Sequence, residues 1–187
     1  MPASPNACRR HIVLASAAAA LLPNGIPRPA RAATPACGRQ TPSQMEGPFF
    51  TPNSPRRNNL VDRGVTGASL VLTGRVLDPM CKPIANALLD FWQCDARGDY
   101  DNKGFRLRGH QFTDAKGFYR LETIVPGTYP GRTPHIHVKV QRSGGRILTT
   151  QLYLEDHPGN DRDFLFDHRL IMERGANGLS FDFVLSV

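Results

Sequence analysis

The segment TPHIHVKV, residues 133–140, has the two-residue alternation of a β-strand and decides what kind of sheet the chain can build. Successive side chains of a strand point to opposite faces. Ile136 and Val138 therefore share one face, and His135 and His137 share the other. The apolar face predicts a contact with the core. The histidine face has two interpretations, a pair of metal ligands or polar residues on a solvated face.

Short strand patterns separated by turn residues continue outward from this segment. They are SLVLTGRVLD (69–78), IANALLDFWQCD (84–95), GFYRLETIV (117–125), HIHVKVQ (135–141), ILTTQLYL (147–154) and LSFDFVLSV (179–187). Strands at this spacing, with Gly, Pro and Asp between them, predict an all-β protein with one antiparallel β-sandwich over residues 69–187. Trp92 lies in the most apolar strand and is predicted to be buried. Only DRDFLFDHRLIM (161–172) favours a short helix.

The first 32 residues predict an export signal rather than part of the core. Arg9 and Arg10 precede an apolar run from Ile12 to Leu22, and small residues follow at 30–32. A run of this length is too short to span a bilayer as a helix, so we expect no stable membrane insertion. The paired arginines favour the twin-arginine route to the periplasm or the medium, with an ordinary secretory signal as the alternative.

Residues 33–68 are rich in Pro, Asn, Arg and Gly and predict an extended N-terminal arm, wrapped around the domain at 69–187. The formal charge of the chain is +7, but residues 1–32 contribute four arginines and no acid, so the remainder carries +3. There is no basic run, which argues against nucleic acid as a partner. Small anionic substrates are compatible with this charge, and a homo-oligomer is left open.

Three cysteines follow the predicted signal: Cys37, Cys81 and Cys94. A disulfide fits an oxidising compartment, and the odd number leaves one thiol over. There is no CxxC motif and no Cys/His spacing typical of zinc sites.

Two of the four tyrosines lie outside the strand patterns, in segments that contain glycine. Tyr100 belongs to RGDY and Tyr129 to PGTYPG, whereas Tyr119 and Tyr153 lie in strands, where a packed ring is expected. A loop tyrosine is usually a half-buried anchor. Near a His-x-His pair, two of them suggest phenolate ligands, because a hard cation such as Fe(III) favours anionic oxygen donors.

Three longer stretches resemble the intradiol ring-cleavage dioxygenases, especially the small secreted members. They are ANALLDFWQCDARGDYD, RGHQFTDAKGFYRLETIVPGTYPGRTPHIHVKV and TTQLYLEDHPGND, and the resemblance runs from residue 41 to the C-terminus. It implies a prealbumin-like β-sandwich core and one mononuclear non-haem Fe(III) per chain. It also implies that a catechol-type diol is cleaved between its two hydroxyls by O2, to a muconate-type diacid.

The resemblance assigns roles position by position. The implied iron ligands are Tyr100, Tyr129, His135 and His137. Arg132 matches the arginine that stabilises charge on the substrate, and Gln151 matches a polar residue of the same pocket. Tyr129 matches the tyrosinate that substrate displaces. Only Pro130 and Gly131 separate Tyr129 from Arg132, where many relatives have a longer segment, so the identity of the catechol is open.

Two other functions are compatible with parts of the sequence. The strand pattern also fits a prealbumin-like module of a secreted protein that binds a partner and catalyses nothing. Such a module has no reason to keep two tyrosines and two histidines together. A cupin-type metal site also uses His-x-His, but it needs a glutamate soon afterwards, and HIHVKVQRSGG has none.

Overall fold

The computed structural model describes residues 38–186 of the chain. The export signal expected at residues 1–32 lies outside the described residues and stays a prediction. Cys37 also lies outside them. Cys81 is disulfide-bonded, whereas Cys94 is a free, buried thiol. Among the described residues, no helix is long and apolar enough to cross a membrane.

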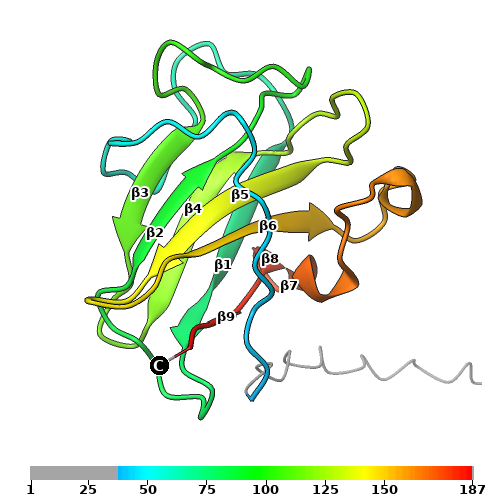
Figure 1. Ribbon diagram of the computed structural model, residues 1–187. Helices are drawn as coiled ribbons and strands as arrows, with labels where there is room; N and C mark the ends of the chain where they lie inside the picture. Colours follow the sequence, from blue (N-terminus) through cyan, green and yellow to red (C-terminus); the bar gives the residue numbers. More distant parts are fainter. Residues whose placement is uncertain (1–37, 187) are drawn as a thin grey trace, which may run out of the picture. The chain divides into compact units, whose positions relative to one another are not determined.

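The described residues form nine strands and two short 3-10 helices, so the all-β prediction is confirmed (Figure 1). The strands are β1 (Ser69–Leu77), β2 (Leu88–Trp92), β3 (Arg108–Phe112), β4 (Phe118–Ile124), β5 (His135–Gln141), β6 (Leu148–Leu154), β7 (Ile171–Gly175), β8 (Gly178–Ser180) and β9 (Phe183–Val184). The 3-10 helices are η1 (Asn160–Arg162) and η2 (His168–Leu170).

The strands follow the order β3-β2-β5-β6-β7-β8-β1-β4, and β9 pairs with β1. Most pairs are antiparallel, but β7 runs parallel to β6, and both β8 and β9 run parallel to β1. The antiparallel pairing expected from the sequence therefore holds for most strand pairs, and these three parallel pairs are the exceptions. The reason lies in the C-terminal segment, which crosses from the edge of β6 to the edge of β1 and joins β3-β2-β5-β6 to β1-β4 in one path.

Two local predictions also differ from the structure. The segment 161–172 holds two single-turn 3-10 helices, η1 and η2, instead of one continuous helix, because the Asp163 and Asp167 carboxylates accept hydrogen bonds from the N–H groups of the residue two positions later. Such bonds compete with the helical pattern. The single strand expected at 179–187 is divided into β8 and β9, since the Asp182 side chain between them accepts from the Arg75 N–H.

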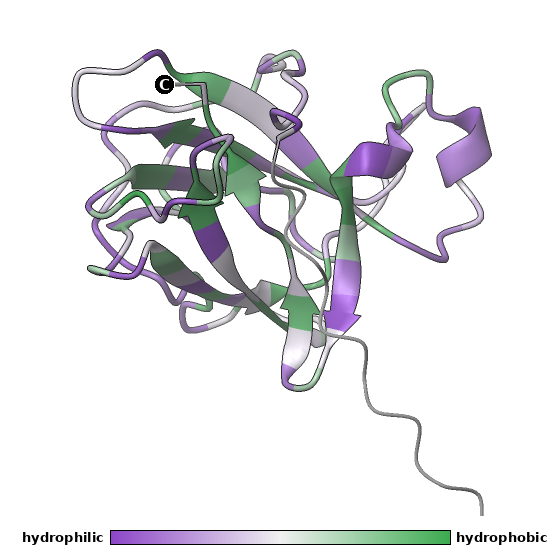
Figure 2. Ribbon diagram, turned by 90° about the horizontal axis from the view of Figure 1, so that it is seen from below, coloured by the Kyte–Doolittle hydropathy of each residue, from purple (hydrophilic) through white to green (hydrophobic). Residues whose placement is uncertain are grey.

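One apolar core joins the two parts of the strand path. Leu72 of β1, Leu121 of β4, Leu89 of β2 and Val138 of β5 are fully buried and belong to the same cluster. Figure 2 shows the green of apolar residues concentrated on the strands and the purple of polar residues on the connecting loops. Trp92 is 1% exposed, which confirms its predicted burial.

The N-terminal arm covers the face of β5 and β6 that points away from this core (Figure 1). Gln151 and Tyr153 of β6 lie on this face, where Nε2 of Gln151 donates to the Met45 carbonyl and the Tyr153 hydroxyl donates to Oε1 of Gln44. As a result, His135 and His137 are 1% and 2% exposed. The solvated-face interpretation of the two histidines is therefore wrong, because the face is polar but sealed.

Replacing Ile124, which is 2% exposed in the core, with alanine should lower the free energy of unfolding by about 2–5 kcal/mol. The matched change Ile147→Ala removes the same atoms from a side chain that is 55% exposed, and it should cost no more than about 0.5 kcal/mol. Urea unfolding of the two variants measures both values. Equal losses would show that the core is misassigned.

Candidate metal centre

A row of side chains crosses four neighbouring strands beneath the arm. Arg108 of β3 pairs with Trp92 of β2, Trp92 with His137 of β5, and His137 with Gln151 of β6. Residues that pair across strands point to the same face. The Trp92 ring stacks on the His137 imidazole, with centroids 4.7 Å apart and planes 9° apart. The sheet register thus fixes the place and orientation of His137.

His135 has its tautomer set by the backbone. Its Nδ1 lies 2.7 Å from the Thr133 carbonyl oxygen, which can only accept, so Nδ1 carries the proton. The bare Nε2 then faces Nε2 of His137 at 3.1 Å. Imidazole nitrogens lie about 2.0–2.1 Å from a bound zinc ion, so two that share such an ion approach each other to roughly 3 Å. The observed separation fits a shared transition-metal ion.

The two loop tyrosines are brought together by a close contact between glycine-containing backbones. A Cβ at Gly98 would lie 2.2 Å from the Thr128 carbonyl oxygen, and one at Gly127 would lie 2.6 Å from the Ala96 carbonyl oxygen. The Gly127 N–H also donates to the Asp95 carbonyl at 2.8 Å. These contacts hold the segments that carry Tyr100 and Tyr129 side by side.

The four predicted ligands form one cluster of rings. Tyr100 lies with its ring centroid 6.0 Å from Tyr129 and 6.3 Å from His137, and Tyr129 lies 5.8 Å from His135. The Tyr100 hydroxyl is 3.5 Å from Nε2 of His135. The structure therefore brings together all four residues that the sequence nominated.

Electrostatics in this cluster favour neutral imidazoles. Burial, together with the nearby Arg132 charge, lowers the pKa of His135 to about 4, and burial with the His135 and Arg132 charges lowers that of His137 well below its usual range. Both rings therefore keep lone pairs available for a metal at neutral pH. Burial raises the pKa of Tyr100 well above its usual value, so a phenolate there needs a cation close by.

The donor set fits Fe(III) better than zinc. Within the described part of the chain, no group of three or more His, Cys, Asp and Glu side chains could hold a metal ion alone. An ion beside His135 and His137 would therefore need the oxygens of Tyr100 and Tyr129. Two phenolates and two imidazoles suit a hard trivalent cation, which favours anionic oxygen donors. Nδ1 of His137 is buried with no hydrogen-bond partner among the described residues.

Arg132 is adjacent to Tyr129 because of the short turn between them. The Arg132 N–H donates to the Tyr129 carbonyl at 3.0 Å, and Gly131 has a φ of +78°, as the third residue of a Pro-Gly turn requires. One Nη of Arg132 donates to the Tyr129 hydroxyl at 3.3 Å, and the other donates to Oε1 of Gln151. Nε2 of Gln151 donates to the Met45 carbonyl of the arm.

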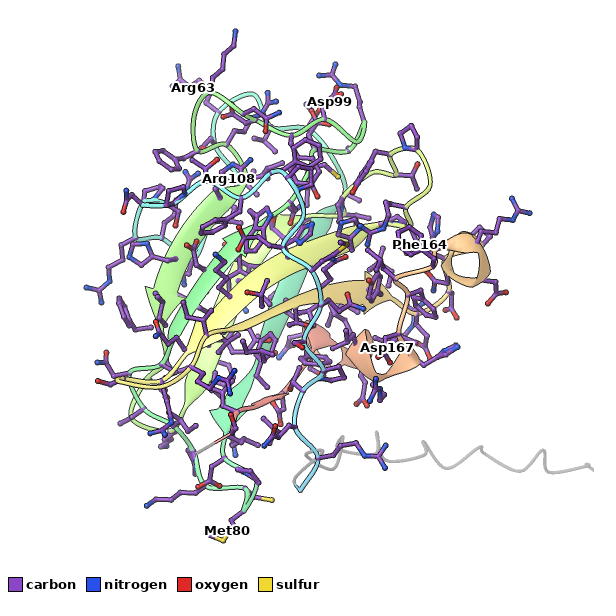
Figure 3. All side chains as sticks on the ribbon, in the orientation of Figure 1. Arg63, Met80, Asp99, Arg108, Phe164 and Asp167 are labelled. Carbon is purple, nitrogen blue, oxygen red and sulfur yellow. The ribbon has the colours of Figure 1, made fainter. Side chains whose placement is uncertain are left out.

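Three residues that the sequence did not nominate complete the surroundings. Phe49 of the arm stacks on Tyr100, with centroids 4.3 Å apart. Arg108 is 1% exposed and donates to the carbonyls of Phe49 and Asp101. Figure 3 labels it in the upper part of the molecule, as it does Asp99. Asp163 pairs with Arg132. None of the three belongs to a motif with a characteristic spacing, so the sequence offered no signal that could have revealed them.

Comparison with known proteins gives the family. A family model described as Dioxygenase matches residues 45–186. Catechol 1,2-dioxygenase of Candida albicans is 31% identical over 67% of this chain and 51% of its own length. The chain spans about half the length of the curated relatives it matches.

Solved structures agree with the sequence comparison. The dioxygenase domain of a dioxygenase carbohydrate-binding protein fusion from Streptomyces sp. SirexAA-E is 53% identical, and the match covers 80% of this chain and 99% of that chain with a TM-score of 0.76. For 3-chlorocatechol 1,2-dioxygenase of Rhodococcus opacus 1CP, the identity is 28%, the coverage 78% and 72%, and the TM-score 0.70. The fold and the two comparisons place the chain in a family of dioxygenases. The chain belongs to the intradiol ring-cleavage dioxygenase family.

Gly98→Ala should disrupt the approach of Tyr100 to Tyr129, because the new Cβ meets a backbone oxygen at 2.2 Å. Gly64→Ala is a matched control, since Gly64 has nearly the same φ (+88° against +91°) but nothing within 4 Å of its Cβ. Both variants carry the backbone strain of an alanine at positive φ, about 1 kcal/mol. Only Gly98→Ala adds the clash with the Thr128 carbonyl, so only this variant should also lose iron. Metal analysis after purification under identical conditions decides, and equal iron contents would contradict the role given to this contact.

The metal-free protein should lose stability as the pH falls from 6.5 toward 4. The unfolded chain protonates His135 near pH 6.5, whereas the folded chain does so only near 4, so acid favours the unfolded state. For His135 alone the loss at pH 5 is about 2 kcal/mol. Urea unfolding at pH 7.5 and pH 5 should show a smaller difference for His135→Gln than for the parent. A difference as large for His135→Gln as for the parent would contradict this role of His135.

Proposed function

We propose that this protein is a non-haem Fe(III) dioxygenase that cleaves a catechol-type ring between its two hydroxyls with O2 and forms a muconate-type diacid. The observation that carries the proposal is the cluster of Tyr100, Tyr129 and the two buried histidines, His135 and His137, whose Nε2 atoms lie 3.1 Å apart. The names of the relatives, catechol and hydroxyquinol 1,2-dioxygenases, support a catechol-type substrate.

These four residues would hold the iron. When bound, Fe(III) would supply a Lewis acid that the diol can chelate through both oxygens, which would make the ring reactive toward O2. The protein contributes a fixed donor set, because the sheet register orients His137 and the Thr133 carbonyl orients His135. The arm keeps bulk water away from both rings.

Tyr129 is the tyrosine better prepared to leave a metal. Its hydroxyl is already 3.3 Å from Nη1 of Arg132, which offers a cationic partner if the phenolate is displaced by a substrate oxygen. Within the described residues, Tyr100 has no such cationic donor, and it is held in place by the stacked Phe49 ring. We therefore assign the displaced ligand to Tyr129 and the permanent one to Tyr100.

Arg132 and Gln151 would act on the substrate rather than on the metal. The guanidinium is mostly buried, with 9% of the side chain exposed, so its charge is little screened by water. It lies at the rim of the ligand cluster, where it can stabilise negative charge that develops on a ring oxygen. Gln151 contacts the same guanidinium and fixes one side of it.

The alternative of a non-catalytic binding module does not account for this cluster. A module that only binds a partner gains nothing from two buried imidazoles with opposed lone pairs, whose desolvation lowers stability in acid. Export, with residues 1–32 as the signal, belongs to the same proposal and rests on their sequence.

Arg132→Ala should keep the iron and its colour and lose turnover about tenfold to a thousandfold, which is the usual cost of removing one preorganised donor. Arg162→Ala removes an exposed arginine from the neighbouring η1 and is the control. Oxygen uptake and iron content are measured for both. If Arg132→Ala turns over like the control, the assigned role of Arg132 is wrong.

The reaction itself is tested with catechol, hydroxyquinol and protocatechuate under 18O2. The proposal expects a muconate-type diacid that carries both labelled oxygen atoms, as mass spectrometry would show. A semialdehyde product would mean cleavage beside the hydroxyls instead of between them. No oxygen uptake by iron-loaded protein with any of the three diols would favour the binding module.

A further inference from the structure

The guanidinium of Arg132 is held by a carboxylate from a distant loop. Nε of Arg132 lies 3.0 Å from both carboxylate oxygens of Asp163, which follows η1. The Asp163 side chain is 0% exposed. A buried charge of this kind is costly unless it is paired and hydrogen-bonded, so this ion pair is a built feature of the site.

The Asp163 carboxylate has further donors from the backbone. Its Oδ2 accepts from the Thr133 N–H at 3.0 Å, and its Oδ1 accepts from the Leu165 N–H at 3.0 Å. Together with Arg132, these bonds use both oxygens of a group that, when ionised, only accepts. The carboxylate therefore cannot rotate without breaking several bonds at once.

The loop that carries Asp163 is itself anchored. The Asn160 side chain donates to the carbonyls of Leu154 and Glu155, and the Thr133 hydroxyl donates to Oδ1 of Asn160. The loop is therefore tied to the end of β6 and to the residue after Arg132. Asp163 reaches the guanidinium from a fixed support.

The contacts of Arg132 determine which N–H donors of its guanidinium are left to bind a substrate. A guanidinium has five N–H donors in a planar fork. One goes to Asp163 through Nε, one to the Tyr129 hydroxyl, and one to Oε1 of Gln151. Within the described residues, the other two donors, one on each terminal nitrogen, make no hydrogen bond of ordinary geometry, although Tyr153 lies near the same charge. Because Asp163 holds Nε, it determines the plane in which these two donors lie.

We propose that Asp163 is a positioning residue for the reaction: it aims the two remaining donors of Arg132 at the site of the substrate. This inference rests on the proposed function for its catalytic consequence, but its structural part concerns only Arg132. Misplacing a catalytic group by about 1 Å can reduce a rate about a hundredfold. Asp163→Asn should therefore lower kcat about tenfold to a hundredfold.

The first experiment compares Asp163→Asn with Asp161→Asn. Asp161 is an exposed aspartate two positions earlier in the same loop, so it undergoes the same chemical change without a contact to Arg132. Asp163→Asn should keep the iron content, the visible band and the anaerobic dissociation constant for catechol within about threefold, while kcat falls. Asp161→Asn should match the parent in all four. A kcat of Asp163→Asn within twofold of the parent would overturn the proposal.

A crystal structure of Asp163→Asn supplies a readout that needs no turnover. The guanidinium of Arg132 should move away from the Tyr129 hydroxyl and from Gln151, while the backbone at 160–165 stays in place. An unmoved guanidinium would refute the positioning role. If instead the parent protein shows no activity while the guanidinium moves in the variant, the proposed function fails and the positioning contact stands.

Chemical rescue covers the case in which Asp163→Asn does not fold. Guanidinium chloride at millimolar concentration should restore activity to Arg132→Ala with saturation, because Asp163 offers an empty, oriented partner for the free cation. Methylammonium, which lacks the planar fork, should restore much less. Equal rescue by both cations, or none by guanidinium, would contradict the proposal.

Discussion

The contact between the loops at Gly98 and Gly127 is the constraint on which the candidate site depends. Each glycine lies against a carbonyl oxygen of the other loop at a distance that no side chain could tolerate. The loops start from different strands, and this contact holds the segments that carry Tyr100 and Tyr129 side by side, with ring centroids 6.0 Å apart. The sheet supplies the two histidines from neighbouring positions of β5. The register of the sheet thus positions the two histidines, and the packing of the two glycines positions the two tyrosines.

Burial gives this arrangement its chemistry. The arm seals the polar face of β5, so the imidazoles of His135 and His137 stay neutral and the phenol of Tyr100 resists ionisation. A bound cation reverses that preference by stabilising the phenolates. Two arginines flank the cluster in different ways. Arg132 is paired with the buried Asp163, whereas Arg108 donates its hydrogen bonds within the described residues to the carbonyl oxygens of Phe49 and Asp101.

The sequence predicts part of this structure and misses part of it, for physical reasons. Alternation in HIHVKVQ predicts both β5 and the shared face of its histidines, because the period of a strand is local. Local alternation cannot reveal β7 or the parallel pairs that β8 and β9 form with β1. These pairs depend on where the long segment after β6 meets the sheet again. Asp163 was missed because its segment favours a helix on pattern, while its carboxylate serves a guanidinium 31 positions earlier. The sealing of the histidine face could not be predicted from β5 alone, since the arm provides it.

The most direct measurement of the central claim is resonance Raman spectroscopy of the purified, iron-loaded protein, excited within its visible absorption band. Two tyrosinates on Fe(III) predict a red to burgundy colour and tyrosinate ring vibrations that weaken in Tyr100→Phe and persist in part when catechol is added without O2. A colourless protein with stoichiometric zinc, or an iron protein without tyrosinate vibrations, would contradict the account.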